Sequence, residues 1–486
     1  MKNKAQSITI ILFAIICCVS IGLRLWKIDQ PIADWHSFRQ VDTASVARIF
    51  TISGIDLLHP RYHDLSNIQS GKDNPQGWRM VEFPLYQGVA AFMYNVFPQL
   101  SIEIYLRLIT ILCSTLTGMF LGIMVMRRTT RATGVMTFFA YAIFPFSIFY
   151  GRAVLPDPFM VFLSIVSLYI LDTKNTEVSW IKTILSGIFA ALALLVKPQA
   201  AFLLLPMLVL FFVFPLRFSQ IVKFLLWGLI ATIPFFLWRA WIMQYPEGIP
   251  AFDWLLNQNG IRFKGAWFFW LFADRIGRLI LGYWGLIPFG IGLLAVSKKE
   301  GWFSRLLLVG SLLYLIIIAG GNVQHDYYQI LLLPVISIYV GKGITYLWMQ
   351  KEKDLSSLGS RSLVIISLLF LFAFSWYTIR TYYWINRPEI IEAGSVADTL
   401  LPKDAKVIAA YNGDTTFLYQ TKRSGWPLNF DIDKKISMGA THYITVSPTD
   451  SDLETKELAE KYTVLVRNEK FAIIDLRKQK TGDNEQ

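Results

Sequence analysis

Long apolar runs alternate with short polar segments along most of the chain. A helix needs about 20 apolar residues to cross the hydrocarbon of a bilayer, and many runs approach or reach that length. No small-residue cleavage site follows the first run, so we interpret it as a retained span and not as a signal peptide. The pattern predicts an α-helical polytopic membrane protein with about 11 transmembrane helices, near residues 8–26, 104–126, 132–150, 157–171, 180–196, 199–215, 221–239, 277–297, 303–320, 328–348 and 362–380.

Basic residues gather in alternate connections between these runs. Because basic loops are retained in the cytoplasm, we expect the N-terminus and these connections to be cytoplasmic. The apolar segment 83–97 is short and is interrupted by Pro84 and Gly88, so we interpret it as a juxtamembrane or re-entrant segment that keeps this orientation. The basic residues are Lys2 and Lys4; Arg127, Arg128 and Arg131; Lys174 and Lys182; Arg217 and Lys223; Lys298, Lys299 and Arg305; and Lys351, Lys353 and Arg361.

Beyond Tyr383 the apolar runs stop and shorter elements follow. We expect helices near 390–401, 414–422 and 451–461, and strands at 406–411, 443–446, 463–466 and 471–476. Such alternation is typical of a small α/β domain. The sequence thus predicts a membrane domain at 1–384, whose external loop 27–82 contains juxtamembrane helices, and an extracytoplasmic α/β domain at 385–486.

Composition and charge support this interpretation. Of the 486 residues, 54% are hydrophobic and only 16% are charged, which excludes an ordinary soluble protein. A net charge of +12 would suit nucleic acid, but the basic residues are scattered between apolar runs, where they determine topology. Cys17, Cys18 and Cys113 lie in apolar runs and are expected to pack as small hydrophobic side chains. We therefore expect contact with membrane lipid and no nucleic-acid partner.

The first polar loop contains an unusual charged stretch, HSFRQVDTASVARIF, at 36–50. Its apolar positions recur at near-helical spacing, which predicts an amphipathic helix on the outer membrane surface. Arg39, Asp42 and Thr43 would share the polar side of that helix. An i,i+3 surface pair between Arg39 and Asp42, worth about 0.2–0.5 kcal/mol, would explain these charges without any function.

Three further charged residues stand at the boundaries of apolar runs. Asp157, in GRAVLPDP at 151–158, is costly there unless it is paired or functional, although it could also cap the helix ahead of Pro158. Lys197 lies between two apolar runs, where its ammonium could snorkel to the interface or bind a phosphate. Glu82, in EFPLYQ at 82–87, could begin a helix or contact substrate.

A polar loop, GGNVQHDYYQ at 320–329, places His325, Asp326, Tyr327 and Tyr328 in a row. Neighbours in sequence rarely bind one metal ion together, and no HxxxH spacing occurs here. Hydrogen bonding to a substrate is therefore favoured over metal binding. The chain also lacks Walker, GxSxG and HExxH motifs in positions that would serve catalysis.

These residues, in this order, resemble the GT-C glycosyltransferases, in the branch that includes protein O-mannosyltransferases and the bacterial aminoarabinose transferases that act on lipid A. The resemblance covers about residues 8–345 and implies a GT-C fold with a polyprenyl-phosphate-linked sugar as donor. No convincing DxD occurs in the first loop and no WWD-like motif in the tail, so a divalent metal is possible but not expected, and no other cofactor is implied. The motifs are 34–50, Glu82-Phe-Pro-Leu-Tyr86, Arg152 with Pro156-Asp157, Lys197-Pro198 and His325-Asp-Tyr-Tyr328.

The resemblance also implies roles for single residues. An aspartate of the external loop would be the general base on an acceptor hydroxyl, with Asp42 preferred and Asp34 second. Asp157 matches the second acidic position of the family. Arg152 or Lys197 would hold the donor phosphate as negative charge grows on it. The expected substrate-binding residues are His36, Arg39, Gln40, Glu82, Tyr86, Arg152, Lys197, His325, Asp326, Tyr327 and Tyr328.

We therefore interpret the chain as an inverting glycosyltransferase of the plasma (inner) membrane. The active site and the C-terminal domain would be extracytoplasmic, and the acceptor could be a glycan, a lipid or a protein. A glycan ligase or polymerase of the same fold is the main alternative. A transporter of lipid-linked sugars is disfavoured because it should show charges at mid-span or repeated halves. A non-catalytic scaffold would tolerate loss of the aspartates.

Overall fold

The structure, a computed structural model, describes residues 2–173, 177–297, 300–349, 355–448 and 452–479. The chain divides into two compact units. The helical unit comprises Met1–Ile28, Leu106–Trp241 and Phe252–Tyr383, and the mixed unit comprises Asp29–Tyr105, Ile242–Ala251 and Trp384–Gln486. The first external segment therefore groups with the C-terminal region. Five of the basic residues expected in the cytoplasm lie outside the described residues, namely Lys174, Lys298, Lys299, Lys351 and Lys353.

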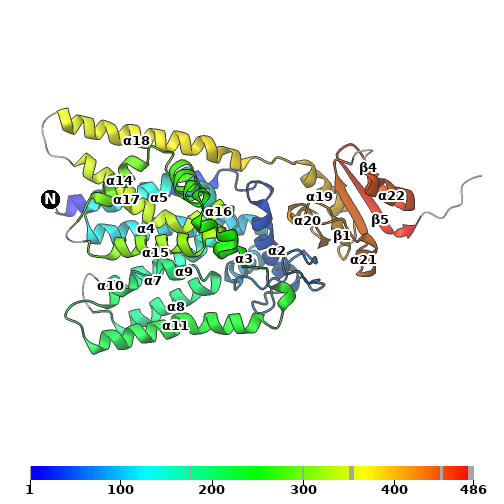
Figure 1. Ribbon diagram of the computed structural model, residues 1–486, viewed down its shortest axis with the longest axis horizontal. Helices are drawn as coiled ribbons and strands as arrows, with labels where there is room; N and C mark the ends of the chain where they lie inside the picture. Colours follow the sequence, from blue (N-terminus) through cyan, green and yellow to red (C-terminus); the bar gives the residue numbers. More distant parts are fainter. Residues whose placement is uncertain (1, 174–176, 298–299, 350–354, 449–451, 480–486) are drawn as a thin grey trace, which may run out of the picture. The chain divides into compact units, whose positions relative to one another are not determined.

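The helical unit is built almost entirely of helices (Figure 1). Helix α11 lies at one edge of this unit in the view and α18 at the opposite edge. The elements are α1 (Lys2–Leu25), most of α4 (Ile102–Arg128), α5 (Arg131–Ile143), α6 (Pro145–Tyr150), α7 (Asp157–Leu171), α8 (Trp180–Val196), α9 (Ala200–Leu203), α10 (Met207–Phe211), α11 (Phe218–Ile242), α12 (Trp254–Asn257), η2 (Gln258–Phe263), α13 (Gly265–Phe268), η3 (Phe269–Ile280), α14 (Leu286–Leu294), α15 (Phe303–Ile317), α16 (Ala319–Gln324), η4 (Asp326–Leu332), α17 (Leu333–Trp348), α18 (Leu355–Ile379) and η5 (Arg380–Tyr383).

Within the described ranges, five helices are long and apolar enough to cross a membrane: Ala5–Leu25, Ile102–Arg128, Phe218–Ile242, Asp326–Trp348 and Ser357–Tyr383. Shorter apolar helices occupy Asp157–Leu171, Trp180–Val196 and Phe303–Ile317. These helices confirm an α-helical polytopic membrane protein. The count of eleven spans is not confirmed.

Several predicted spans are broken by prolines. The run 132–150 divides into α5 and α6 at Phe144, whose backbone is extended ahead of Pro145. A proline disfavours helical geometry in the residue before it and is well suited to the first turn of the next helix. The run 199–215 likewise divides into two short helices, with Pro206 preceding the second. The expectation of one continuous helix in each run was wrong.

A buried arginine braces the break between α5 and α6. Arg24, fully buried near the end of α1, donates from Nη1 to the carbonyl of Ala142 at 3.0 Å. Its Nη2 donates to Ser147 Oγ at 2.8 Å. The break exposes carbonyls that an intact helix would satisfy internally, and a guanidinium has enough donors to serve several of them.

Glycines allow α14 and α17 to pack backbone against backbone. A Cβ atom on Gly292 would lie 1.8 Å from the carbonyl oxygen of Tyr339, and one on Gly343 would lie 1.8 Å from that of Pro288. Small residues are favoured between membrane helices because they permit this close approach. Helix α17 also packs on α5, and this packing buries α17 in the interior of the helical unit.

The mixed unit combines the first external segment with a five-stranded sheet. The strand order is β2-β1-β3-β5-β4, with β1 parallel to β2 and β3, and β5 antiparallel to β3 and β4. The C-terminal α/β region is thereby confirmed, although β2 and α21 were not predicted. The elements are α2 (Ser37–Ser53), α3 (Leu85–Val96), η1 (Pro246–Gly248), α19 (Glu389–Leu400), β1 (Lys406–Ala409), α20 (Thr416–Gln420), β2 (Ser424–Trp426), α21 (Ile432–Ser437), β3 (His442–Val446), α22 (Leu453–Lys461), β4 (Tyr462–Arg467) and β5 (Phe471–Gln479).

Both faces of this sheet are covered. Val407 points into a core with residues of α19 and α20, and its neighbour Ile408 points into a second core with residues of α22. At the β2 edge, residues of the first external segment continue the sheet. Gly425 N donates to the carbonyl of His63 at 2.9 Å, and Leu65 N donates to the carbonyl of Gly425 at 2.8 Å.

Candidate active site

Helix α2 carries the charged stretch of the first loop, and it is largely buried. Arg39, Asp42 and Thr43 are 7%, 3% and 1% exposed. The helix packs against both α3 and α20. The expectation of a surface helix that shows these residues on a polar side was therefore wrong.

Three donors hold the Asp42 carboxylate, two from the loop between α2 and α3 and one from the C-terminal region. Arg79 Nη2 lies 3.0 Å from Oδ2, and Gln69 Nε2 donates to the same oxygen at 2.9 Å. Thr415 Oγ1 donates to Oδ1 at 2.7 Å. Arg79 also donates to the Gln69 side-chain carbonyl. Both oxygens of Asp42 are thus occupied by protein groups.

Arg39 pairs with Glu82 and not with Asp42. Its Nη2 donates to both carboxylate oxygens, at 3.0 and 2.9 Å, and Gln87 Nε2 donates to Oε1 at 3.2 Å. Glu82 lies just before α3, so this buried pair ties α2 to the start of α3. Tyr86 follows within α3 and is fully buried. The expectation of a surface i,i+3 pair between Arg39 and Asp42 was wrong.

Asp34, His36 and Gln40 shape the entry to α2. His36 adopts a left-handed conformation, with φ 54° and ψ 34°, immediately before the helix. Gln40 Nε2 donates to Asp34 Oδ1 at 2.8 Å and to the carbonyl of Trp35 at 3.0 Å. Asp34 is 5% exposed. The glutamine amide therefore orients the Asp34 carboxylate.

In the helical unit, Asp157 and Lys197 form a buried ion pair. Lys197 Nζ lies 2.8 Å from Oδ1 and 2.9 Å from Oδ2. Asp157 is the first residue of α7, but its side chain makes no capping bond, and Lys197 directly follows α8. Neither the capping interpretation of Asp157 nor the snorkelling of Lys197 is correct.

Aromatic rings line one side of the Lys197 ammonium. Its Nζ lies 5.6 and 5.5 Å from the ring centroids of Tyr327 and Tyr328, which stack at 4.8 Å. His325 stacks on Tyr327 at 5.4 Å, and Trp254 meets the His325 ring edge-on at 5.4 Å. A cation over ring faces is attracted by their quadrupoles. The ammonium is thus attracted by the tyrosine rings as well as by the Asp157 carboxylate.

Asp326 and Arg152 are engaged within the helical unit itself. The carboxylate of Asp326 accepts from the hydroxyls of Tyr150 and Tyr382, the latter at 2.5 Å. Arg152 Nη1 donates to the carbonyl of Lys27 at 3.0 Å. Each of the two charged residues is 1% exposed. The Asp326 bonds connect α6, η4 and η5, and Asp326 directly precedes the tyrosines that face Lys197.

Sequence reasoning missed two arginines on η3, which is a π-helix. Arg275 Nη1 donates to Asp274 Oδ2 at 2.8 Å, and Arg278 Nε donates to Asp274 Oδ1 at 2.6 Å. The side chains of Arg275 and Arg278 are 13% and 35% exposed. π-helical segments are rare and frequently mark functional sites. The available signal was DRIGR at 274–278, a charged group that opens an apolar run.

Two buried residues of the mixed unit have shifted pKa values. Burial lowers the pKa of His63 to about 3, and the guanidinium groups of Arg48 and Arg423 act in the same direction. Burial raises the pKa of Asp64 to about 6, against a hydrogen bond from the backbone of Ser66. At neutral pH the histidine is therefore neutral and the aspartate is mostly ionised.

The described residues contain no group of three or more His, Cys, Asp and Glu side chains that could hold a metal ion. The expectation of a reaction without a divalent metal stays a prediction, because ligands can also come from substrate and water.

Comparisons with known proteins add evidence on the family and the fold. The family described as dolichyl-phosphate-mannose-protein mannosyltransferase matches residues 83–241, a segment that contains Arg152, Asp157 and Lys197. No curated protein matches the sequence.

Solved structures match over nearly the whole chain. ArnT from Cupriavidus metallidurans bound to undecaprenyl phosphate is 12% identical, with a TM-score of 0.64 over 98% of each chain. The archaeal oligosaccharyltransferase AglB from Archaeoglobus fulgidus, in complex with an inhibitory peptide and a dolichol-phosphate, is 8% identical, with a TM-score of 0.57 over 91% of this chain and 70% of that chain. These likenesses confirm the predicted GT-C fold.

Proposed function

We propose that the chain is an inverting membrane glycosyltransferase. It would transfer a sugar from a polyprenyl-phosphate-linked donor to an acceptor hydroxyl on the extracytoplasmic face. The observation that carries the proposal is the fold likeness over 98% of this chain and of ArnT, whose structure holds undecaprenyl phosphate. The buried Lys197 cluster supplies chemistry that a phosphate leaving group requires.

Lys197 is the proposed ligand of the donor phosphate. A lysine ammonium is a compact charge on a flexible stem, so it can turn from one anion to another. Its partner Asp157 would hold the ammonium in place until the phosphate arrives. Arg275 and Arg278 are proposed as further phosphate ligands, because both lie partly exposed on an irregular helix. Arg152 would act as a positioning residue, since it already holds the Lys27 carbonyl.

The reaction is a single displacement at the anomeric carbon. A carboxylate removes the proton of the acceptor hydroxyl as the hydroxyl oxygen attacks that carbon. The bond between the anomeric carbon and the phosphate oxygen breaks, and the polyprenyl phosphate leaves with the electron pair. Cations near that oxygen stabilise the growing charge. One displacement inverts the anomeric configuration.

Asp34 is proposed as the base in place of Asp42. A general base needs an oxygen that can reach the acceptor hydroxyl. Both oxygens of Asp42 are bonded to Arg79, Gln69 and Thr415, which favours a structural role. Asp34 is the second aspartate that the family resemblance implies for this role, and the Gln40 amide already orients it.

A transfer assay tests the proposal. Purified full-length protein in lipid nanodiscs is incubated with radiolabelled polyprenyl-phosphate sugars that differ in the sugar, and release of label to acceptor or water is measured. We expect turnover with at least one donor, loss of it in Asp157→Asn and Asp34→Asn, and no change in Asp253→Asn, an exposed aspartate of the helical unit. Absence of turnover with every donor, in protein that melts normally, would contradict the proposal.

The proposed metal independence and orientation have separate tests. Turnover should be unchanged in excess EDTA, and restoration by Mg²⁺ or Mn²⁺ after its loss would contradict the metal-free reaction. The orientation is tested with vesicles to which protease is added on the extracytoplasmic side. A cleavage site placed after residue 486 should be cut, whereas one placed before residue 2 should not be cut.

A further inference from the structure

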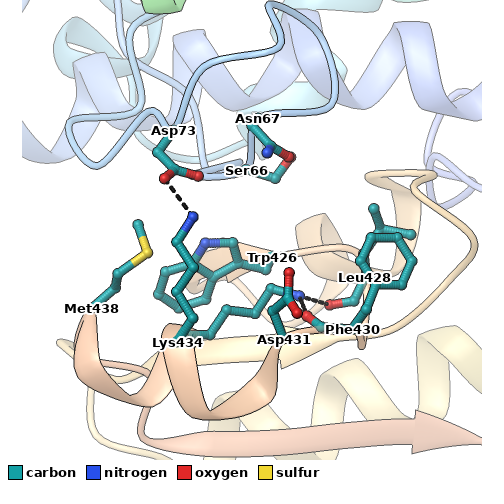
Figure 2. A pocket seen from close by; sticks show the side chains of 10 residues that line it. Ser66, Asn67, Asp73, Trp426, Leu428, Phe430, Asp431, Lys434 and Met438 are labelled. Atoms are coloured by element: carbon teal, nitrogen blue, oxygen red, sulfur yellow. Dashed lines mark hydrogen bonds and ion pairs between the residues drawn. The ribbon is translucent and has the colours of Figure 1, made fainter.

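A shallow pocket lies within the mixed unit and opens to solvent. Figure 2 shows it between a loop that carries Ser66, Asn67 and Asp73 and a facing segment that carries Trp426 and Lys434. None of the residues predicted from the sequence lines the pocket, so its role is independent of the charged clusters.

The facing segment offers aromatic surface. Trp426 is 3% exposed and is fixed by packing with Leu65 and Ile408 in the core of the sheet. Phe430, in contrast, is 60% exposed, although its ring is large and apolar. Aromatic rings that border a polar pocket can cover the apolar C–H face of a sugar ring. Met438 extends the apolar part of the lining.

The polar lining has hydrogen-bonding capacity that the protein leaves open. Asn67 and Asp431 are exposed, and neither side chain makes a hydrogen bond to another described residue. Lys434 Nζ lies 2.7 Å from Asp73 Oδ2, and the buried Lys435 ammonium donates to the carbonyl of Leu428 at 2.8 Å.

The balance of charge indicates the class of ligand. Two lysines and two aspartates line the pocket, so it has no net charge that would select an anion. A carboxylate only accepts hydrogen bonds, whereas an amide both donates and accepts them. A sugar hydroxyl can pair with either group, because it is both a donor and an acceptor. A neutral ring with several hydroxyls and an apolar face suits this lining better than a phosphate does.

We infer that this pocket binds a sugar unit of a neutral saccharide acceptor. The inference rests on the proposed function and narrows its acceptor from three classes to a glycan. Hydroxyls of the sugar donate to Asp431 and pair with the Asn67 amide, while its C–H face covers the ring of Phe430. The pocket holds a part of the acceptor away from the reacting hydroxyl, and therefore contributes to affinity.

Binding to the full-length protein in nanodiscs tests the inference directly. Saturation-transfer NMR is measured with the methyl glycosides of glucose, galactose, mannose and N-acetylglucosamine, and separately with inorganic phosphate and a serine-containing tripeptide. At least one glycoside should bind, and Asp431→Asn and Phe430→Ala should each weaken it about tenfold. Asp433→Asn is the matched control, because Asp433 is exposed in helix α21, which directly follows Asp431, and does not line the pocket.

The outcomes separate this inference from the proposed function. Glycoside binding that is absent, or equal in all variants, overturns the inference, as does binding of only phosphate or tripeptide. Glycoside binding that responds to the variants, in a protein without any donor turnover, supports the pocket and contradicts the glycosyltransferase. With an active enzyme, the variants should raise KM for a glycan acceptor about tenfold while release of the donor sugar to water stays unchanged. An unchanged KM for the glycan acceptor in these variants would overturn the inference about the pocket but not the proposed function.

Discussion

Asp157 of the helical unit and Asp42 of the mixed unit are both buried beside a cation, but they are held differently. Asp157 places both oxygens on one flexible ammonium, that of Lys197. Asp42 is held by a guanidinium and by two neutral donors from other segments. A single ammonium can change partners, whereas a planar guanidinium within a network fixes its geometry. The comparison indicates that the pair of Asp157 and Lys197 can open for substrate, whereas the contacts of Asp42 stabilise the fold.

The largest effect should follow from opening the first pair. Asp157→Asn and Lys197→Gln should each lower transfer by about 10²–10³-fold, because each disturbs the charge that meets the phosphate. Lys197→Gln should also destabilise the protein by about 3–5 kcal/mol, since it leaves a carboxylate buried without a cation. The double variant should recover thermal stability but not transfer. If the double variant recovered both stability and transfer, the pair of Asp157 and Lys197 would have only a structural role. Asp157 and Asp42 would then not differ in function.

Asp42→Asn should behave in the opposite way. It leaves the Arg79 guanidinium buried without its counter-ion, so we expect a loss of about 3 kcal/mol in the free energy of unfolding. Transfer by the protein that remains folded should stay within a few-fold of the native value. Thermal melts and transfer assays on the same preparation measure both. A hundredfold loss of transfer with an unchanged melting temperature would instead identify Asp42 as the base.

A smaller effect sharpens the structural interpretation. Thr415→Val removes one neutral donor from Asp42 Oδ1 and should cost about 1 kcal/mol. If the two residues act as one tie, the cost in the Asp42→Asn background should be clearly smaller, which a double-mutant cycle detects. Strict additivity would show that Thr415 and Asp42 stabilise the fold separately.

The smallest net effect in the native protein is a pH dependence near the Asp42 network. The depressed pKa of His63, about 3, removes stability as pH falls below the ordinary histidine value, because only the unfolded chain takes up the proton readily. The raised pKa of Asp64, about 6, adds stability as pH falls toward 4, because the folded chain takes up that proton first. Between pH 6 and 4 the two contributions oppose each other.

Single substitutions should reveal this opposition. In Asp64→Asn, melting temperature should fall more steeply between pH 6 and 4 than in the native protein, by the equivalent of about 1 kcal/mol per pH unit. His63→Gln should change the slope in the other direction. Equal slopes in native protein and both variants would show that neither group titrates differently on folding.

The sequence predicted elements well where the apolar pattern is continuous. Helices α4, α7 and α8 occupy three predicted runs closely, because each is mostly apolar and has polar ends. The prediction was wrong where a proline interrupts a run, as at Pro145 and Pro206, although the preference of proline for the first helical turn could have located both breaks. Strand β2 was missed because it has only three residues, one of them glycine.

For the site, the sequence identified charged residues but not their partners. The Arg39 to Glu82 and Asp42 to Arg79 pairs join residues far apart in the chain, whereas spacing along a helix suggested a pair between Arg39 and Asp42. Asp157 and Lys197 were both selected, since each is costly at a membrane boundary, but nothing local shows that they meet. Arg275 was missed although DRIGR at 274–278 is a visible charged group, because nothing in a single sequence marks that group as part of a π-helix.

The strand pairing at the β2 edge restricts how the protein can be rearranged. Residues 63–65 complete that edge through hydrogen bonds to Gly425, although they precede the sheet by more than 300 residues in the chain. A C-terminal fragment produced alone would expose an unpaired strand, a common starting point for aggregation. Chimaeras that exchange the C-terminal region between relatives would have to exchange this short segment as well. The unit that can be exchanged between proteins is therefore encoded by two separate stretches of the gene.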